Sequence, residues 1–432
     1  MRRIEIYDAT RTGQASRTKG GVEGGGVPRE REPLDREPLE RLAERLGGRV
    51  LQEGGASLIE VVRSVGNNET RGKVDLGGMA ALEKRHLEVL FPEVAERGKI
   101  SPGMFLFFDI ETTGLSGGAG TRFFLIGLLE STEGEMRLVQ YFLPNLRSEP
   151  LFLRKISQRF TPQRILVSYN GKSFDYNVMR NRFVMNGLDM ETEAAARLHL
   201  DLLYSSRRLW KTLCPGFTLS TVERVVLGYS RRQDIPGEMI PDVYFRYLGG
   251  RNETGELESV LEHNRDDIIS LSALLIRQVN AVREGCAGVN KAGVGVNVVS
   301  LADMLCRIGR NSEARRVLLT RAEETEAAVR LGLLCKREGA FEEALGHFGT
   351  LLRGSRPASV CVFACTEIAK IYEHTVKDYE TALSYANRAR ERLSRRKALY
   401  RERGAGDKEM DEVERRIARL LKKRERQAGR SV

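Results

Sequence analysis

One run of eight residues constrains the fold of this 432-residue chain more than any other segment. Residues 104–111 read MFLFFDIE, a short, dense, Phe-rich apolar run that ends in acids. Two further apolar runs follow at residues 123–130 (FFLIGLLE) and 136–143 (MRLVQYFL), with glycine between them. Dense runs of this length are typical of strands that are covered on both faces. We therefore expect three adjacent strands, with the first one central in the sheet.

The next segments alternate between helical and strand patterns. Residues 151–160 have helical apolar spacing, residues 164–170 (RILVSYN) form a strand pattern, and residues 175–187 are again helical. Strands followed by alternating helices and strands predict an α/β domain around a mixed sheet.

After about residue 285 the pattern becomes entirely helical. Small residues recur along three similar segments, at Ala302, Gly309 and Ala314, then at Gly332, Gly339 and Ala344, and again at Ala369 and Ala382. This recurrence is typical of two or three degenerate tetratricopeptide repeats, in which paired helices approach closely. An ordinary helical bundle is the alternative interpretation.

The N-terminal region is rich in Gly, Pro and alternating charge, and we expect residues 1–78 to be largely disordered. Short helices are predicted within it around residues 38–46 and just after it, over 79–90. The expected organisation is therefore a disordered region (1–78), an α/β domain (79–284) and a helical region (290–432).

The composition indicates the kind of partner. Lys and Arg number 70 against 59 Asp and Glu, a net charge of +11, which favours polyanions such as nucleic acid. No stretch of about 18 apolar residues or secretory signal is present, and six sparse cysteines indicate a reduced, cytoplasmic protein without a membrane partner. The last residues, 391–432, are basic, and they either contact phosphates or form a solvated terminal helix.

Two carboxylates stand at the end of the first predicted strand. Asp109 and Glu111 are two residues apart, so both side chains point to the same face of the sheet. Two acids at the end of a buried strand are costly unless a cation neutralises them. Carboxylate oxygens suit hard divalent cations such as Mg²⁺ or Mn²⁺, which makes these residues candidate metal ligands.

Two later motifs add candidate site residues. Asp175 is the last residue of NGKSFD and falls in the first turn of the next helix. His263 and Asp267 lie four apart on one face of a helix that begins near residue 257. Asp266 is an adjacent alternative to Asp267. Taken singly, these residues also fit a solvated strand edge, a helix-dipole charge and an ordinary histidine.

Taken together, the motifs DIETTGL, NGKSFD and HNRDD resemble those of the DEDD exonucleases in the ribonuclease H-like superfamily. The four carboxylates of that family correspond here to Asp109, Glu111, Asp175 and Asp267. Residues 199–211 (HLDLLYSSRRLWK), 228–245 (GYSRRQDIPGEMIPDVYF) and 261–271 (LEHNRDDIISL) are similar to the YprB-type branch, some members of which also carry helical repeats. The resemblance covers about residues 80–275. It implies an α/β fold with a ribonuclease H-like mixed sheet flanked by helices, followed by an all-α TPR-like helical domain.

The resemblance also implies a reaction. It predicts a 3′–5′ exonuclease that hydrolyses DNA or RNA with two Mg²⁺ or Mn²⁺ ions. Asp109 would bridge the ions, Glu111 and Asp267 would complete one site, and Asp175 would hold the other. His263 would act as general base, although its spacing of four from Asp267 matches the family's tyrosine-bearing subgroup rather than its commonest histidine-bearing one.

Neighbouring residues are candidates for substrate binding. One set lies beside the acids in the sequence: Thr112, Gly114, Leu115 and Asn170. Two basic clusters are candidates for contact with the phosphates of a single strand. The first consists of Arg207, Arg208 and Lys211 around Trp210, and the second of Arg231 and Arg232. Trp210 itself fits core packing better.

Three other functions stay open at this point. The chain could be a nucleic-acid-binding module with a degenerate site, a scaffold that binds a protein partner through its helical repeats, or a structure-specific endonuclease on the same fold. The sequence does not separate DNA from RNA, because it shows no module that reads a 2′-hydroxyl.

Overall fold

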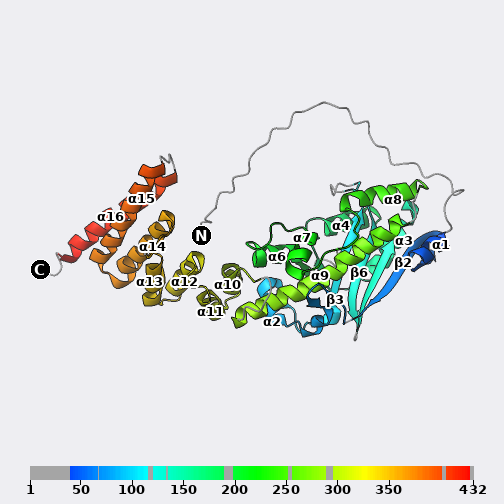
Figure 1. Cartoon of the computed structure of the whole chain (residues 1–432), viewed down its shortest axis with the longest axis horizontal. Helices are drawn as coiled ribbons and strands as arrows, with labels where there is room; N and C mark the ends of the chain where they lie inside the picture. Colours follow the sequence, from blue (N-terminus) through cyan, green and yellow to red (C-terminus); the bar gives the residue numbers. More distant parts are fainter. Residues whose placement is uncertain are drawn as a thin grey trace, which may run out of the picture.

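The computed structural model describes residues 39–66, 68–114, 120–132, 135–188, 198–251, 255–288, 295–400 and 405–428. Within them, a mixed sheet of seven strands forms the centre of the N-terminal part, and helices form all of the C-terminal part (Figure 1). This is the ribonuclease H-like α/β architecture followed by an all-α region that the sequence predicts.

The sheet has the strand order β1-β2-β7-β6-β5-β8-β9. Its strands are β1 (Gly48–Glu53), β2 (Ala56–Val65), β5 (Phe105–Thr112), β6 (Phe123–Thr132), β7 (Glu135–Phe142), β8 (Ile165–Ser168) and β9 (His199–Asp201). The strands pair antiparallel from β1 to β5, whereas β8 and β9 run parallel to β5. A separate hairpin joins β3 (Thr70–Arg71) and β4 (Val74–Asp75). The three predicted strands are therefore adjacent, and β5 is an interior strand next to the central β6.

Strand β5 is buried on both faces because its side chains alternate between two hydrophobic clusters. Phe105 and Phe107 pack in the cluster that contains much of helix α9, while Leu106 and Phe108 pack in the cluster on the opposite face. Helices α3 (Glu149–Ser157), α4 (Asp175–Met185) and α8 (Ile240–Leu248) contribute to that second cluster. The long helix α9 (Glu256–Ala287) crosses β5 and β6 on the first face.

Smaller elements complete this part of the chain. The remaining α-helices are α1 (Leu39–Arg45), α2 (Lys84–Leu90), α6 (Leu202–Trp210) and α7 (Leu219–Val222). Short 3₁₀ helices are η2 (Leu76–Ala81), η3 (Pro92–Glu96), η4 (Pro102–Met104), η5 (Leu146–Ser148) and η7 (Gly237–Met239), and η6 (Glu223–Leu227) is a π-helix. The helix expected over residues 79–90 forms only in its second half, as α2.

The prediction of disorder for residues 1–78 is wrong for residues 39–78. These residues form α1, two strands of the main sheet and the β3–β4 hairpin, whereas residues 1–38 lie outside the described residues. Charged residues interrupt the apolar pattern of β2, so the local sequence does not indicate a buried strand. These charges can be buried because they pair with residues from other elements. Glu60, for example, is buried and pairs with Arg49 at 2.6 Å and with Arg159 at 3.8 Å.

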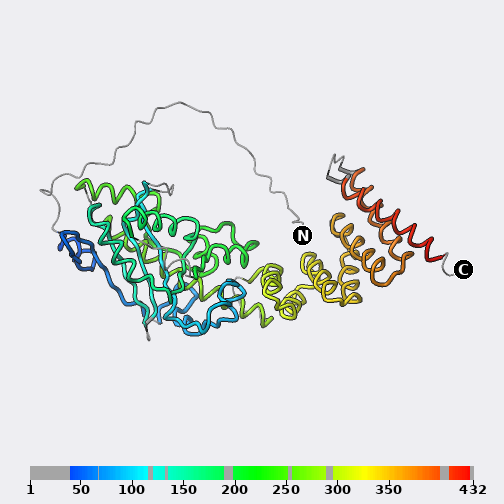
Figure 2. The backbone as a smooth tube through the Cα atoms, turned by 180° about the vertical axis from the view of Figure 1, so that it is seen from behind, coloured from blue at the N-terminus to red at the C-terminus, as the bar shows by residue number. Residues whose placement is uncertain are grey.

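The helical region begins at α10 and extends away from one end of the sheet domain (Figures 1 and 2). Its helices are α10 (Val298–Arg307), α11 (Asn311–Leu319), α12 (Thr325–Arg337), α13 (Phe341–Thr350), α14 (Ala358–Ile371), the π-helix η8 (Tyr372–Val376), α15 (Tyr379–Tyr400) and α16 (Ala405–Ala428). The recurring small residues have two roles. A Cβ at Gly332 would lie 2.4 Å from the Phe348 ring, so this glycine permits close helix contact, while Gly309 and Gly339 have φ of +77° and +81° in the turns after α10 and α12. The identification of these pairs as tetratricopeptide repeats stays a prediction.

One hydrophobic cluster continues from the sheet domain into the helical region. It includes Leu271 and Leu275 of α9 together with Leu301, Leu305 and Leu331 of α10 and α12. The backbone N–H of Asn297 also donates to the carbonyl of Leu209 at 2.8 Å. The first helical pairs are thus packed onto the α/β domain rather than tethered to it.

Candidate nuclease site

Four carboxylates from three elements influence one another electrostatically. Asp109 and Glu111 extend from the same face of β5, Asp175 begins α4, and Asp267 lies on α9. Desolvation raises the pKa of both Asp109 and Glu111, and repulsion from Asp267 and Asp175 raises it further. The structure thus brings together the acids that the three sequence motifs singled out.

Glu111 and Asp175 are buried, and Asp109 is half-buried. Desolvation, followed by repulsion among the carboxylates, holds the pKa values of Asp109 and Glu111 well above their usual ranges. Desolvation and repulsion from Asp201 and Asp267 raise the pKa of Asp175 to about 7. Glu111 Oε1 is buried with no hydrogen-bond partner. Without an added cation, the ionised site is therefore electrostatically unfavourable.

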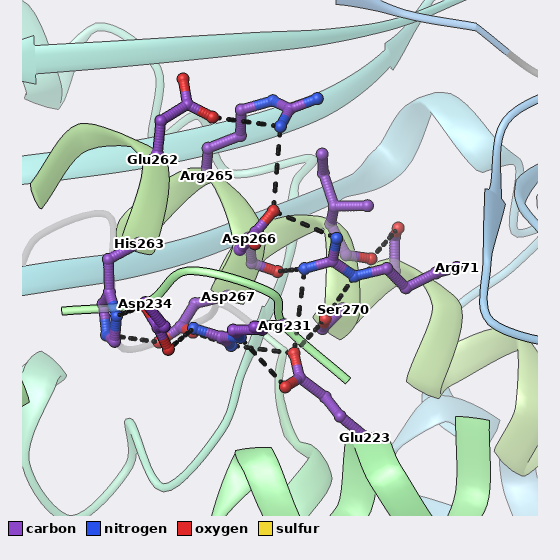
Figure 3. Close-up of polar contacts among 12 residues, drawn as sticks. Arg71, Glu223, Arg231, Asp234, Glu262, His263, Arg265, Asp266, Asp267 and Ser270 are labelled. Atoms are coloured by element: carbon purple, nitrogen blue, oxygen red, sulfur yellow. Dashed lines mark hydrogen bonds and ion pairs between the residues drawn. The ribbon is translucent and has the colours of Figure 1, made fainter. Parts of the chain in front are cut away.

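His263 lies one helical turn before Asp267 and is held from its other side by Asp234. The His263 Nδ1–Asp234 Oδ1 distance is 2.6 Å, and Nε2 lies 3.7 Å from Asp267 Oδ2 (Figure 3). Asp234 therefore fixes the ring so that Nε2 faces the acids. Asp234 lies in the segment 228–245 that is similar to the YprB-type branch, but no local pattern in the sequence indicates its role.

Arg231 is not exposed as the predicted phosphate ligand would be. Its side chain is only 8% exposed, and its guanidinium donates to both oxygens of Glu223, at 2.8 and 3.1 Å, to Asp234 at 3.1 Å, and to Asp267 (Figure 3). Although burial opposes the charge, Asp267 and Glu223 raise the pKa of Arg231 further above its usual value. Arg231 thus acts as an internal counter-ion to carboxylates of the site, whereas its neighbour Arg232 is exposed.

Asp266, the alternative to Asp267, points to a different partner. It accepts hydrogen bonds from the buried Arg71 through its side chain at 3.1 Å and through its carbonyl at 2.7 Å. Arg71 also donates to Ser270 at 2.9 Å and stacks on Tyr229 at 3.7 Å. Asp266 therefore pairs with Arg71 of the β3–β4 hairpin, and Asp267 is the residue whose charge acts on the other acids.

A strained turn places Asp175 at the start of α4. Asn170 has φ of +64°, and its backbone N–H donates to Asp201 Oδ1 at 2.8 Å, while that of Lys172 donates to Asp201 Oδ2 at 3.2 Å. Gly171 is required here because a Cβ would lie 2.3 Å from Ser168 Oγ. Asp201 thus holds the turn that positions Asp175, a role with no local sequence signal.

The other predicted substrate residues lie in varied settings. Thr112 is buried and donates through Oγ1 to the Gly114 carbonyl at 2.9 Å, while Leu115 lies outside the described residues. Arg207 and Arg208 are exposed on α6 and Lys211 is exposed directly after it, whereas Trp210 is fully buried, as its core interpretation predicts. The exposed aromatic on that helix is Tyr204, whose hydroxyl lies 2.9 Å from Ser173 Oγ.

The donor chemistry of the site fits hard divalent cations, since its carboxylates offer oxygen ligands and Glu111 Oε1 has no partner. Within the described ranges, however, no group of three or more His, Cys, Asp or Glu side chains is arranged to hold a metal ion. Mg²⁺ is usually bound by one or two carboxylates together with substrate phosphates and water. A preformed protein cage is therefore not required for such an ion.

Comparison with known proteins identifies the family. Residues 106–278 match the sequence model of the RNase_H superfamily. The chain is 31% identical over 323 residues to the uncharacterized protein YprB of Bacillus subtilis strain 168. The alignment covers 73% of this chain and 74% of that protein. The chain belongs to the YprB family. The resemblance predicted from the three motifs is thereby confirmed, and the superfamily match supports a nuclease-type enzyme.

Solved structures of E. coli exonuclease I are similar to this YprB family member at a lower level. The complex with a dT13 oligonucleotide is 18% identical, covers 42% of this chain and 41% of that one, and has a TM-score of 0.26. The complex with a 5cy-dT13 oligonucleotide is 14% identical over 74% of this chain and 98% of that one, with a TM-score of 0.25. The first alignment spans less than half of exonuclease I, and similarity at this level concerns the fold alone.

Among the described helices of this family member, none combines the length and apolarity that a membrane crossing requires.

Proposed function

We propose that this chain is a metal-dependent 3′–5′ exonuclease that hydrolyses phosphodiester bonds of DNA or RNA. The main support is the group of four carboxylates, of which Glu111 and Asp175 are buried, Asp109 is half-buried, and all three have raised pKa values. A buried acidic group of this kind is costly to maintain for folding alone, and perturbed carboxylates are typical of functional sites. The ribonuclease H superfamily match over the same residues supports phosphodiester hydrolysis.

In the proposed site, Asp109 would serve as a ligand to both of two Mg²⁺ or Mn²⁺ ions, Glu111 and Asp267 would help to hold one ion, and Asp175 would help to hold the other. When bound, such ions neutralise charge on the phosphate and lower the pKa of the attacking water.

His263 is the proposed general base. Its Nε2 accepts a proton from the attacking water, and its Nδ1–H donates to Asp234, which stabilises the imidazolium that forms. This role explains why His263 is bound at Nδ1 while Nε2 faces the acids.

The proposed substrate is a strand with a free 3′ end. The exposed cations Arg207, Arg208 and Lys211 lie on α6 and at its C-terminal end. Asp201 caps the N-terminus of this helix and also holds the turn before Asp175. The three cations would contact the phosphates, and exposed Tyr204 offers a surface on which a base can stack. Thr112, Gly114 and Asn170 lie closer to the acids and would contact the terminal nucleotide.

The decisive experiment incubates end-labelled single- and double-stranded DNA and RNA with the full chain and either Mg²⁺ or Mn²⁺. We expect a ladder of mononucleotide loss from the 3′ end. Asp109→Asn should lower the rate by at least about 1000-fold, equivalent to about 4 kcal/mol of transition-state stabilisation, while strand binding measured by fluorescence anisotropy persists.

Two outcomes would contradict the proposal. A single internal cut would replace the exonuclease with a structure-specific endonuclease. No cleavage of any substrate, combined with retained binding, would favour a nucleic-acid-binding protein with a degenerate site, and a scaffold would then be tested through protein capture by residues 290–432.

A further inference from the structure

Three residues stand side by side across the central strands beneath helix α9. Asp109 of β5 pairs with Gly127 of β6, and Gly127 pairs in turn with Gln140 of β7. Asn264 of α9, which is fully buried, spans this row. Its Nδ2 donates to Asp109 Oδ2 at 2.9 Å, and its Oδ1 accepts from Gln140 Nε2 at 2.9 Å. One amide thus connects a site carboxylate to a strand two positions away.

The middle member of the row must be glycine. A Cβ at Gly127 would lie 2.3 Å from Asn264 Oδ1 and 2.0 Å from Ile268 Cδ1, both on α9. Since Gly127 has an ordinary backbone conformation, the requirement is one of space. The missing side chain lets α9 approach β6 closely enough for the Asn264 amide to reach both neighbouring strands.

Gln140 fixes the orientation of the Asn264 amide. Gln140 Nε2 also donates to the Leu261 carbonyl at 2.8 Å, so its NH₂ group is directed toward α9. Gln140 Oε1 is buried with no partner. If the Gln140 amide were rotated by 180°, its NH₂ group would lose both acceptors on α9 and would gain none in return. Because Gln140 donates to Asn264 Oδ1, the NH₂ of Asn264 must face Asp109.

A neutral donor suits a carboxylate that has to bind a cation. The Asn264 bond favours the ionised form of Asp109 but adds no positive charge. The carboxylate keeps further lone pairs for other ligands, since its two oxygens offer about four acceptor sites. A guanidinium bound to Asp109 would instead add a positive charge beside the ligand atoms.

We propose that Asn264 is a positioning residue that presents Asp109 to divalent metal, and that Gln140 acts through Asn264. This inference rests on the proposed function, because it gives Asp109 the metal-ligand role. It adds two side chains and one glycine, Gly127, to the residues that set the affinity of the site.

The test measures Mn²⁺ affinity of the full chain by isothermal titration calorimetry and by electron paramagnetic resonance of free Mn²⁺. Asn264→Leu should weaken binding by about 10- to 100-fold, the usual cost of removing a residue that orients a metal ligand. Gln140→Met, which leaves Asn264 in place, should weaken binding in the same direction by about 10-fold or less. In hydrolysis, both variants should need more Mn²⁺ and recover most of their kcat when Mn²⁺ is saturating.

Gln278→Met is the matched control. Gln278 is also a fully buried amide on the α9 side of the sheet domain, where it donates to the Leu202 carbonyl at 3.0 Å and to Ser206 Oγ at 2.9 Å. Its loss should lower thermal stability and leave Mn²⁺ affinity unchanged.

The outcomes separate the inference from the proposed function. If wild-type protein binds neither Mn²⁺ nor Mg²⁺, the proposed function and the inference both fail. If wild type binds metal but Asn264→Leu and Gln140→Met match it, the inference alone is wrong. Should Asn264→Leu fail to fold, the Mn²⁺ affinities of Gln140→Met and Gln278→Met still test the inference, which is wrong if the two affinities are equal.

Discussion

The two parts of the molecule treat buried carboxylates in opposite ways. In the helical region Glu373 is completely buried in η8, where it accepts hydrogen bonds from Arg416, from Arg419 at 2.8 Å and from Lys423 at 3.0 Å. Burial alone would raise its pKa, but these bonds outweigh burial and lower the pKa of Glu373 to about 2. In the α/β domain Glu111 and Asp175 are also buried and Asp109 is half-buried, yet their pKa values are raised.

The difference separates a structural acid from a candidate functional one. Glu373 joins α16 to the preceding helices, so at least part of the basic C-terminal segment serves internal ion pairs rather than phosphates. The acids of β5 and α4 lack cations in comparable number, although arginines are abundant in this chain. Carboxylates whose pKa values are raised by burial and by like charges are typical of functional sites.

The largest expected effect comes from Glu111→Gln, which removes one uncompensated charge. Hydrolysis should fall by at least about 1000-fold, because one metal ligand is lost. The metal-free protein should at the same time unfold at a higher temperature, since a neutral amide replaces a buried carboxylate. Activity within tenfold of wild type would remove Glu111 from the proposed reaction.

The reverse pattern is expected for Glu373→Gln. Three cations would lose their shared anion, and the free energy of unfolding should fall by about 3 kcal/mol, as when a buried ion pair is broken. Urea denaturation measures this loss. The hydrolysis rate per folded molecule should not change, and a selective loss of activity would mean that the helical region takes part in the reaction.

The smallest expected effect is a pH dependence. The folded-state pKa of Asp175, about 7, lies above its ordinary value of 3.8, so the folded protein retains a proton that the unfolded chain releases. Its contribution to stability is therefore present at low pH and is lost as pH rises toward 7. Buried His199, whose pKa is lowered to about 3, acts in the opposite direction below pH 6.5, so the comparison has to be made against Asp175→Asn.

Thermal unfolding of metal-free wild type and Asp175→Asn at pH 5.5 and pH 8 isolates this term. The variant should gain stability relative to wild type at the higher pH, and saturating Mg²⁺ should reduce or reverse that gain. A difference in Tm that does not change with pH would show that Asp175 is not buried against other negative charge.

The local sequence pattern is sufficient to predict those strands that consist mainly of apolar side chains. The segments that became β5, β6, β7 and β8 are dense in apolar residues, and the acids of β5 follow from the alternation of side chains along a strand. Strands β1, β2 and β9 were not predicted. Their place in the sheet depends on pairing with distant strands and on ion pairs such as that of Glu60 with Arg159.

The sequence by itself determined the α/β and helical classes and the family, and it predicts the four candidate acids, because strand and helix periodicity and short motifs are properties of neighbouring residues. Only the tertiary structure decided that Asp266 pairs with Arg71, that Arg231 is an internal counter-ion, and that Asn264 reaches Asp109 across Gly127. Each of these depends on which distant side chain lies within hydrogen-bond reach of a buried charge. That distance is set by how α9 packs on the sheet, and no local pattern encodes it.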